Sequence, residues 1–175
     1  MVCRMGRKVL TSGLCRIDEG EPMKRRQKPA YGPIGSVSTA TTRTEDLIPS
    51  FLWECDRLRL TRKERQSVNE IKRASKREGY FESEDASLDL NETLFDVLNN
   101  HALPYFYFGS HPGDGSDYGF WLDEGFEESF DGMKVSDLSE VPHGYTGEVL
   151  HVNDHGNMTL YAYTRGRGRE LWGIV

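Results

Sequence analysis

The sequence has few cysteines, no long hydrophobic run and few basic residues in its second half. Its three cysteines, Cys3, Cys15 and Cys55, are odd in number and lack CxxC spacing, which argues against a disulfide framework or a thiolate zinc site. A membrane-spanning helix needs about 18 or more consecutive apolar residues, and the sequence contains no such run. It also contains no basic segment followed by the apolar core of a secretory signal. We therefore expect a protein of a reducing cytoplasm.

The composition is that of a folded and mildly acidic protein. The 175 residues include 22 Lys and Arg against 28 Asp and Glu, with 37% hydrophobic and 11% aromatic residues. This content is too apolar and too aromatic for a wholly disordered chain. It is too polar for a membrane protein, so the composition leaves a globular domain.

The charges are distributed unevenly along the chain. Residues 1–43 hold nine bases and three acids, whereas residues 81–175 hold four bases and 18 acids. Within residues 81–140 there are 15 acids and one base, Lys134. Acids gathered on one face would repel nucleic acid and attract proteins with basic, nucleic-acid-binding clefts. Solubility is the plainer explanation of the same charges.

The N-terminal segment shows no regular hydrophobic period. Residues 1–43 are rich in Gly, Pro, Ser, Thr and basic residues, and we predict a disordered or loosely attached arm. Met23 is an alternative start, because the codons for residues 19–22 resemble a bacterial ribosome-binding site; residues 1–22 would then be a start-site artefact. A genuine basic arm that contacts a phosphate backbone is the other interpretation.

Three helices are predicted in the middle of the chain. The first begins with Asp46 as its cap, which places Pro49 in the first turn. The second is opened by a capping box of Thr61 and Glu64 and covers residues 61–78. Its apolar stripe is thin and the rest of its surface is basic, as expected for a solvated helix or for a contact with nucleic acid or an acidic partner. Residues 80–88 are expected to be a connector before a third helix, which starts at residue 89.

The hydrophobic period changes from 3.6 to 2 beyond Pro104, which indicates strands. Helices followed by strands predict an α+β fold, with about three N-terminal helices packed on an antiparallel sheet of about five strands, in a single domain of residues 44–175. The acidic residues 123–145 are expected to form an irregular excursion across the sheet. The predicted strands are residues 105–108, 118–122, 149–152, 158–163 and 170–175.

Two turn-rich loops contain residue types that bind metals: His111, Asp114 and Asp117 in one, and Asp154 and His155 in the other. Carboxylates in a glycine-rich loop suit a divalent metal ion such as Ca²⁺ or Mg²⁺. If the five side chains met, they could activate water in a metal-dependent hydrolase or nuclease. Turn chemistry explains the same residues, because Asp accepts backbone N–H groups and Gly supplies positive φ.

Other catalytic signals are weak. The GxSxG, GxxxxGK[ST] and GxGxxG patterns are absent, so neither a nucleophile elbow nor a nucleotide phosphate loop is indicated. Cys55 falls on the apolar face of the first helix and is predicted to be a core residue. The run RGRGR at residues 165–169 is typical of either a solvated turn or a phosphate-binding segment.

The segments YFGSHPGDGSDYGFW (residues 107–121), VNDHGNMTLY (residues 152–161) and LWGIV (residues 171–175) resemble parts of small acidic proteins of uncharacterised function encoded by bacteriophages and prophages. The resemblance covers about residues 44–175, and the basic helix and the N-terminal arm depart from it. No activity is established for that group, so no catalytic residue is implied. The resemblance implies a viral accessory gene expressed in the cytoplasm of a bacterial host.

The leading hypothesis is a non-enzymatic accessory protein that binds and inhibits a host protein, in the manner of anti-CRISPR or anti-restriction proteins. Its acidic surface would occupy the basic cleft of a nucleic-acid-handling complex. The alternatives are the metal-dependent enzyme, with a divalent ion, and a nucleic-acid-binding module that uses the arm or residues 61–78. The residues predicted to contact the partner are Asp123, Glu124, Glu127, Glu128 and Asp131, with Phe126 and Phe130 as apolar anchors.

Overall fold

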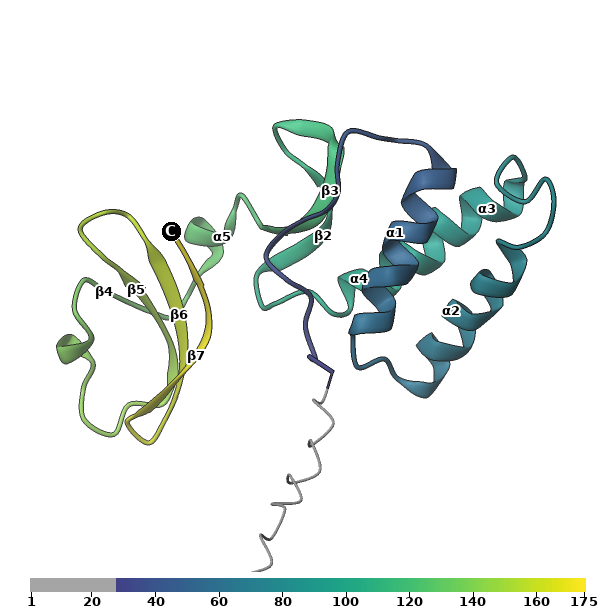
Figure 1. The fold of residues 1–175 in the computed structure, drawn as a ribbon. Coiled ribbons are helices and arrows are strands. Elements are labelled where there is room, and N and C mark those ends of the chain that lie inside the picture. The colour runs from purple at the N-terminus through teal and green to yellow at the C-terminus, as the bar shows by residue number, and fades with distance from the viewer. Residues whose placement is uncertain (1–27) are drawn as a thin grey trace, which may run out of the picture.

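A computed structural model describes residues 28–175, with helices mainly in the N-terminal half and strands in the remainder (Figure 1). The α+β class is therefore confirmed, whereas the predicted arm lies outside the described residues from 1 to 27. The helical elements are α1 (Thr44–Arg57), α2 (Arg62–Ala74), α3 (Glu84–Leu88), the π-helical η1 (Asp89–Leu94), α4 (Phe95–Asn99), α5 (Phe126–Ser129) and the 3-10 helix η2 (Leu138–Glu140). The strands are β1 (Gly35–Ser38), β2 (Phe106–His111), β3 (Asp114–Leu122), β4 (Met133–Val135), β5 (Gly147–Val152), β6 (Met158–Thr164) and β7 (Arg167–Ile174).

The strands form two sheets, which corrects the prediction of one sheet of about five strands. One sheet has the order β1-β3-β2 and the other the order β4-β5-β6-β7. All pairs are antiparallel except β4 with β5, which is parallel. The division arises because β2 and β3 turn Phe108 and Phe120 towards the helices, whereas Leu150, Leu160 and Trp172 of the other sheet belong to a separate apolar cluster.

Residues 28–122 form what we call the helical lobe. Its core is a cluster of buried residues from α1, α2, the 84–99 helical segment, β2 and β3. Phe51 of α1 lies at its centre, with its ring centroid 5.5 Å from that of Phe95 and 4.9 Å from that of Phe108 in edge-on arrangements. Among the described residues, no helix is long and apolar enough to cross a membrane.

The capping box that opens α2 is confirmed. Thr61 Oγ1 accepts from the Glu64 N–H at 3.3 Å, and a Glu64 carboxylate oxygen accepts from the Thr61 N–H at 2.8 Å. The helix ends at Ala74, four residues before the predicted end. The buried residues of α2 are Val68, Ile71 and Ala74, as its thin stripe predicted.

Two helix starts differ from their predictions. Helix α1 begins at Thr44, so Asp46 lies in its first turn, where it accepts from the Thr41 hydroxyl at 2.8 Å, and Pro49 lies inside the helix. The third helical segment begins at Glu84, within the predicted connector. Ser83 caps it by accepting from the Ala86 N–H at 3.2 Å, a local signal that competes with the one at Asp89.

Residues 28–43 are ordered against the rest of the helical lobe, contrary to the prediction of a loose arm. Strand β1 pairs with β3, and Gly119 permits this approach because a Cβ there would lie 2.2 Å from the Gly35 carbonyl oxygen. Earlier in the segment, the Ala30 carbonyl oxygen contacts Nδ1 of the buried His101 at 2.6 Å. The Gly32 N–H donates to the His101 carbonyl oxygen at 2.8 Å. These long-range bonds supply the order that the local sequence does not signal.

Residues 123–175 form what we call the sheet lobe, whose core is small and aromatic. Trp172 lies between the rings of Phe106 and Phe126, at centroid distances of 5.3 and 5.4 Å. Its indole N–H donates to the Pro104 carbonyl oxygen at 2.9 Å. The Tyr105 hydroxyl donates to the Glu148 carboxylate. These contacts join the sheet lobe to the start of β2.

Candidate acidic binding surface

The acidic segment between the two sheets is anchored by its own aromatic residues. Asp123 begins the turn into α5 by accepting from the Gly125 N–H at 2.8 Å. Phe126 and Phe130 are buried, with exposed fractions of 1% and 7%. The prediction that these two residues anchor a partner is therefore corrected, because their rings fill the core of the sheet lobe. The predicted irregular excursion across the sheet is corrected, because the segment contains α5, β4 and η2 and its strand β4 pairs with β5 at the edge of the four-stranded sheet.

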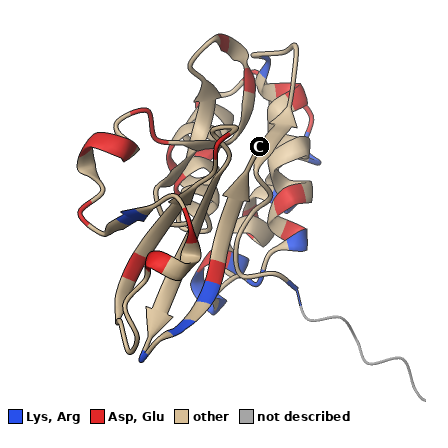
Figure 2. Cartoon of the chain, turned by 90° about the vertical axis from the view of Figure 1, so that its left-hand side faces the viewer, with Lys and Arg blue, Asp and Glu red and all other residues tan. Residues whose placement is uncertain are grey.

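The carboxylates of this segment point to solvent. Figure 2 shows the acids around α5 projecting at the left edge of the sheet lobe. The neighbouring base, Lys134, donates to the Glu127 carbonyl oxygen at 2.6 Å and not to a carboxylate. Within residues 28–175 no salt bridge involves any acid between residues 81 and 140. The exposed acids, which we call the α5 acids, are Asp123, Glu124, Glu127, Glu128 and Asp131.

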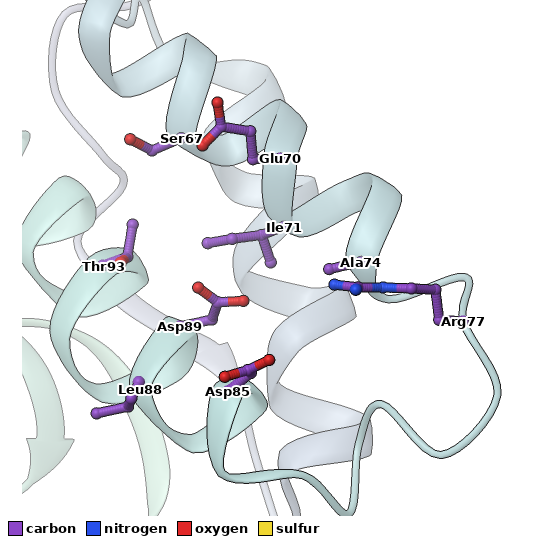
Figure 3. A pocket seen from close by; sticks show the side chains of 9 residues that line it. All are labelled: Ser67, Glu70, Ile71, Ala74, Arg77, Asp85, Leu88, Asp89 and Thr93. Carbon is purple, nitrogen blue, oxygen red and sulfur yellow. The ribbon is translucent and has the colours of Figure 1, made fainter.

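A second acidic feature, which the sequence does not predict, lies between α2 and the 84–99 helical segment. Two pockets of about 340 and 440 Å³ share Ser67 and Thr93, so they form one groove (Figure 3 shows the first). The groove also contains the bases Arg77 and Lys63. The sequence offered no signal for it, because its two walls are helices whose pairing is set by the core. Its carboxylates are Glu64, Glu70, Asp85, Asp89, Glu92 and Asp96.

Several groove carboxylates already serve the fold. Asp89 accepts from the Tyr80 hydroxyl at 2.7 Å, and burial together with this carboxylate raises the pKa of Tyr80. Glu64 belongs to the capping box and lies 3.3 Å from Nε2 of His101. Arg77 and Lys63 thus offset part of the groove's negative charge, and the carboxylates of Asp89 and Glu64 are used in contacts within the fold. The α5 acids are the freer negative surface.

The basic face of α2 is solvent-exposed along its length, and Lys72 pairs with Asp56 of α1. This placement is compatible with both interpretations of the basic helix, so its contact with nucleic acid stays a prediction. The exposed bases of this region are Arg62, Lys63, Arg65, Arg73, Lys76 and Arg77.

The two candidate metal loops belong to different sheets. His111 and Asp114 end β2 and begin β3, whereas Asp154 and His155 lie between β5 and β6. Within residues 28–175 there is no group of three or more His, Cys, Asp or Glu side chains placed to hold a metal ion. The structure therefore does not bring the five predicted ligands together, because each loop is fixed to its own hairpin.

Hydrogen bonds within the protein engage Asp114 and Asp117 in the first loop and Asn153 in the second. Asp114 accepts from the Ser116 N–H at 2.9 Å and hydroxyl at 2.7 Å, and these bonds lower the pKa of Asp114. Asp117 accepts from the Ser36 hydroxyl at 2.9 Å. In the other loop, Asn153 accepts from the His155 N–H at 2.9 Å.

The predicted role of glycine in these loops is only partly correct. Gly156 has a positive φ of 82°, whereas Gly113 and Gly115 are not among the glycines with positive φ. The first hairpin needs none there, because β2 and β3 extend to His111 and Asp114 and leave a two-residue link. The strands are thus longer than the predicted 105–108 and 118–122, and the loop between them is correspondingly shorter.

Cys55 is a core residue, as predicted. It is fully buried, and burial raises the pKa of its thiol to about 12. A thiol with so high a pKa is a poor nucleophile near neutral pH, since the thiolate is the reactive form.

Comparison of the chain with models of protein families, with curated proteins and with solved structures gives no match.

Proposed function

We propose that this protein is a phage-encoded accessory protein that binds a host protein through the α5 acids and inhibits it. The observation that carries the proposal is a set of exposed carboxylates with no salt bridge among residues 28–175. Unpaired like charges held on one short segment repel each other, and a basic partner relieves that repulsion. The resemblance to phage and prophage proteins supports the host context.

The partner is expected to present a basic cleft of the kind that holds nucleic acid. Acids on a projecting segment can enter such a cleft and occupy the positions of phosphates. Electrostatic complementarity raises the rate of encounter and makes it sensitive to salt. Inhibition would follow from competition with DNA or guide RNA for the same cleft. The target class is therefore a nucleic-acid-handling defence complex.

The experiment is capture of partners from a nuclease-treated bacterial lysate by the full chain, at low and high salt, followed by mass spectrometry. Two variants with matched charge changes test the surface. The first neutralises Glu124, Glu127, Glu128 and Asp131, and it leaves Asp123 unchanged because that side chain forms the turn before α5. The second neutralises Glu70, Asp85, Glu92 and Asp96 in the groove.

We expect the first variant to bind the captured protein at least about tenfold more weakly at low salt. The groove variant should bind within about threefold of the parent chain. Equal binding by the first variant and the parent would refute the α5 surface. A parallel capture from untreated lysate that disappears with nuclease treatment would instead favour the nucleic-acid module that uses α2.

A further inference from the structure

A pocket of about 670 Å³ opens at one end of the four-stranded sheet. The segment that leads into β5 forms one wall, and the link between β6 and β7 forms the other. The volume lies within the range of sites that bind small organic molecules. The lining includes His143, Tyr163, Arg165 and Arg167, and no carboxylate. The charged side chains of this lining are therefore basic, although residues 81–175 as a whole are acidic.

The two walls are fixed to each other by backbone contacts. The Gly166 N–H donates to the Tyr145 carbonyl oxygen at 2.8 Å, and the Tyr145 N–H donates to the Pro142 carbonyl oxygen at 3.0 Å. Gly144 and Gly166 touch closely, since a Cβ on Gly166 would lie 2.9 Å from the Gly144 nitrogen. The pocket is thus held by the sheet and does not depend on a loop closing over it.

The charges around the pocket favour an anion. The carboxylates of Asp137 and Glu140 flank the lining but are not part of it; they accept from the Ser139 N–H at 2.8 Å and the Asp137 N–H at 2.9 Å, which hold them at η2. The guanidinium groups of Arg165 and Arg167 make no hydrogen bond or salt bridge with any described residue. Figure 2 shows the bases of the β6–β7 hairpin at its tip, away from α5.

The conformation of Arg165 is the least expected feature. Thr164 pairs with Arg167, so the hairpin has a two-residue link, and Arg165 and Gly166 have φ values of 51° and 77°. Links with two positive φ values favour Asn-Gly. An arginine is strained there, because its Cβ approaches the following carbonyl oxygen. The turn alone therefore does not account for an arginine at this position.

We propose that this pocket binds a nucleoside phosphate. Two guanidinium groups match the geometry of a phosphoryl group, and His143 can add a further donor. The Tyr163 ring offers a flat face for the base. It is held in place over Gly168, where a Cβ would lie 2.7 Å from its Cζ, and beside Tyr145 at a centroid distance of 6.2 Å. The site is independent of the α5 acids.

The test is calorimetric titration of the full chain with AMP, adenosine and inorganic phosphate. We expect AMP to bind at one site, and adenosine and phosphate each to bind more weakly. R165N and R167Q should each weaken AMP binding about tenfold or more, since each removes a charge-assisted contact. R165N should melt at the same temperature as the parent or higher, because Asn suits the positive φ.

The matched control is R169Q. It removes the same charge from β7 at an exposed residue outside the pocket lining, and AMP affinity should stay within about twofold. An equal loss with R169Q and R165N would overturn the proposal, since it would indicate diffuse attraction only. The absence of AMP binding at millimolar concentration would overturn it as well.

A 5′-phosphorylated single-stranded oligonucleotide separates the two sources of this ligand. Tighter binding than AMP, lost in R165N, would identify the end of a nucleic-acid strand. Binding equal to that of AMP or weaker would identify a free nucleotide. Either result supports a nucleoside phosphate as the ligand.

Discussion

The helical lobe and the sheet lobe use their charges in opposite ways. All four salt bridges found among residues 28–175 lie in the helical lobe, from Arg43–Glu45 to His101–Glu64. The described part of the sheet lobe has none, although it contains the α5 acids and three arginines at the β6–β7 end. Two of the four salt bridges join separate elements of the helical lobe: Lys72–Asp56 links α2 to α1, and His101–Glu64 links α2 to the residues after α4. Charge in the sheet lobe is directed to solvent, where a ligand can meet it.

The two lobes also differ in the size of their cores. The cluster in the helical lobe contains 18 buried residues and the cluster in the sheet lobe contains six, one of which, Phe106, comes from β2. Fewer buried residues mean that each contributes a larger share of the lobe's stability. The sheet lobe should therefore be the more fragile of the two.

The largest expected effect is that of W172A. Trp172 is 3% exposed and fills the centre of the small core, so its loss should cost about 3–5 kcal/mol. We expect the sheet lobe to unfold at lower urea concentration than the helical lobe, measured by circular dichroism and tryptophan fluorescence.

The matched control is W53A, because Trp53 is 62% exposed. It should cost no more than about 1 kcal/mol through its contact with Arg57. A single cooperative transition in W172A would show that the lobes do not separate.

A smaller effect is expected in the helical lobe for E64A. The side chain of Glu64, 15% exposed, satisfies the Thr61 N–H and contacts His101, so its removal should cost about 1–2 kcal/mol. Glu70 on the same helix is exposed, and E70A should stay within about 0.5 kcal/mol of the parent. Urea denaturation at neutral pH measures both. Equal effects would mean that the capping box contributes nothing specific.

The same residue makes the helical lobe sensitive to acid. Burial alone would raise the pKa of Glu64, but the hydrogen bonds from Thr61 and the contact with His101 outweigh burial and lower the pKa below its ordinary value near 4.5. A group whose pKa is lower in the folded state stabilises the fold at pH values above its unfolded-state pKa. This stabilisation is lost as pH falls through its folded-state pKa. The advantage of the parent over E64A should therefore shrink below about pH 4.5. An unchanged difference down to pH 3 would contradict this account.

Y105F tests the contact between the lobes at the other end of the pH range. The hydrogen bond to Glu148 is the largest of the causes that raise the pKa of Tyr105 to about 12, from an ordinary value near 10. Folding thus favours the neutral Tyr105 hydroxyl. Its contribution to the stability of the fold is present below pH 10 and is lost as pH rises to about 12. We expect the parent to lose stability over that interval more steeply than Y105F. At pH 7 the variant should be less stable by about 1 kcal/mol.

The smallest effect is expected for D114A in the β2–β3 hairpin. Asp114 is exposed and its carboxylate serves only the local turn, so the melting temperature should change less than in W172A, E64A or Y105F. Addition of Ca²⁺, Mg²⁺ or a chelator should shift the parent and D114A equally. A metal-dependent shift that is confined to the parent would revive the metal hypothesis for this loop.

The sequence by itself determined the local features of this protein. The capping box at Thr61, the buried stripe of α2 and the strands with alternating or aromatic residues follow from interactions a few residues apart. The α+β class follows from their order. The acidic character of residues 123–131 is a property of composition. All of these survive in the structure because nothing distant competes with them.

Only the tertiary structure decided which surfaces are open. The pairing of β1 with β3, the division into two sheets and the burial of Phe126 and Phe130 depend on contacts between distant segments. The acidic groove and the Arg165 pocket likewise arise where separate elements meet. The physical reason is that long-range packing sets a side chain's neighbours across a sheet or between helices. Local periodicity carries no information about that packing.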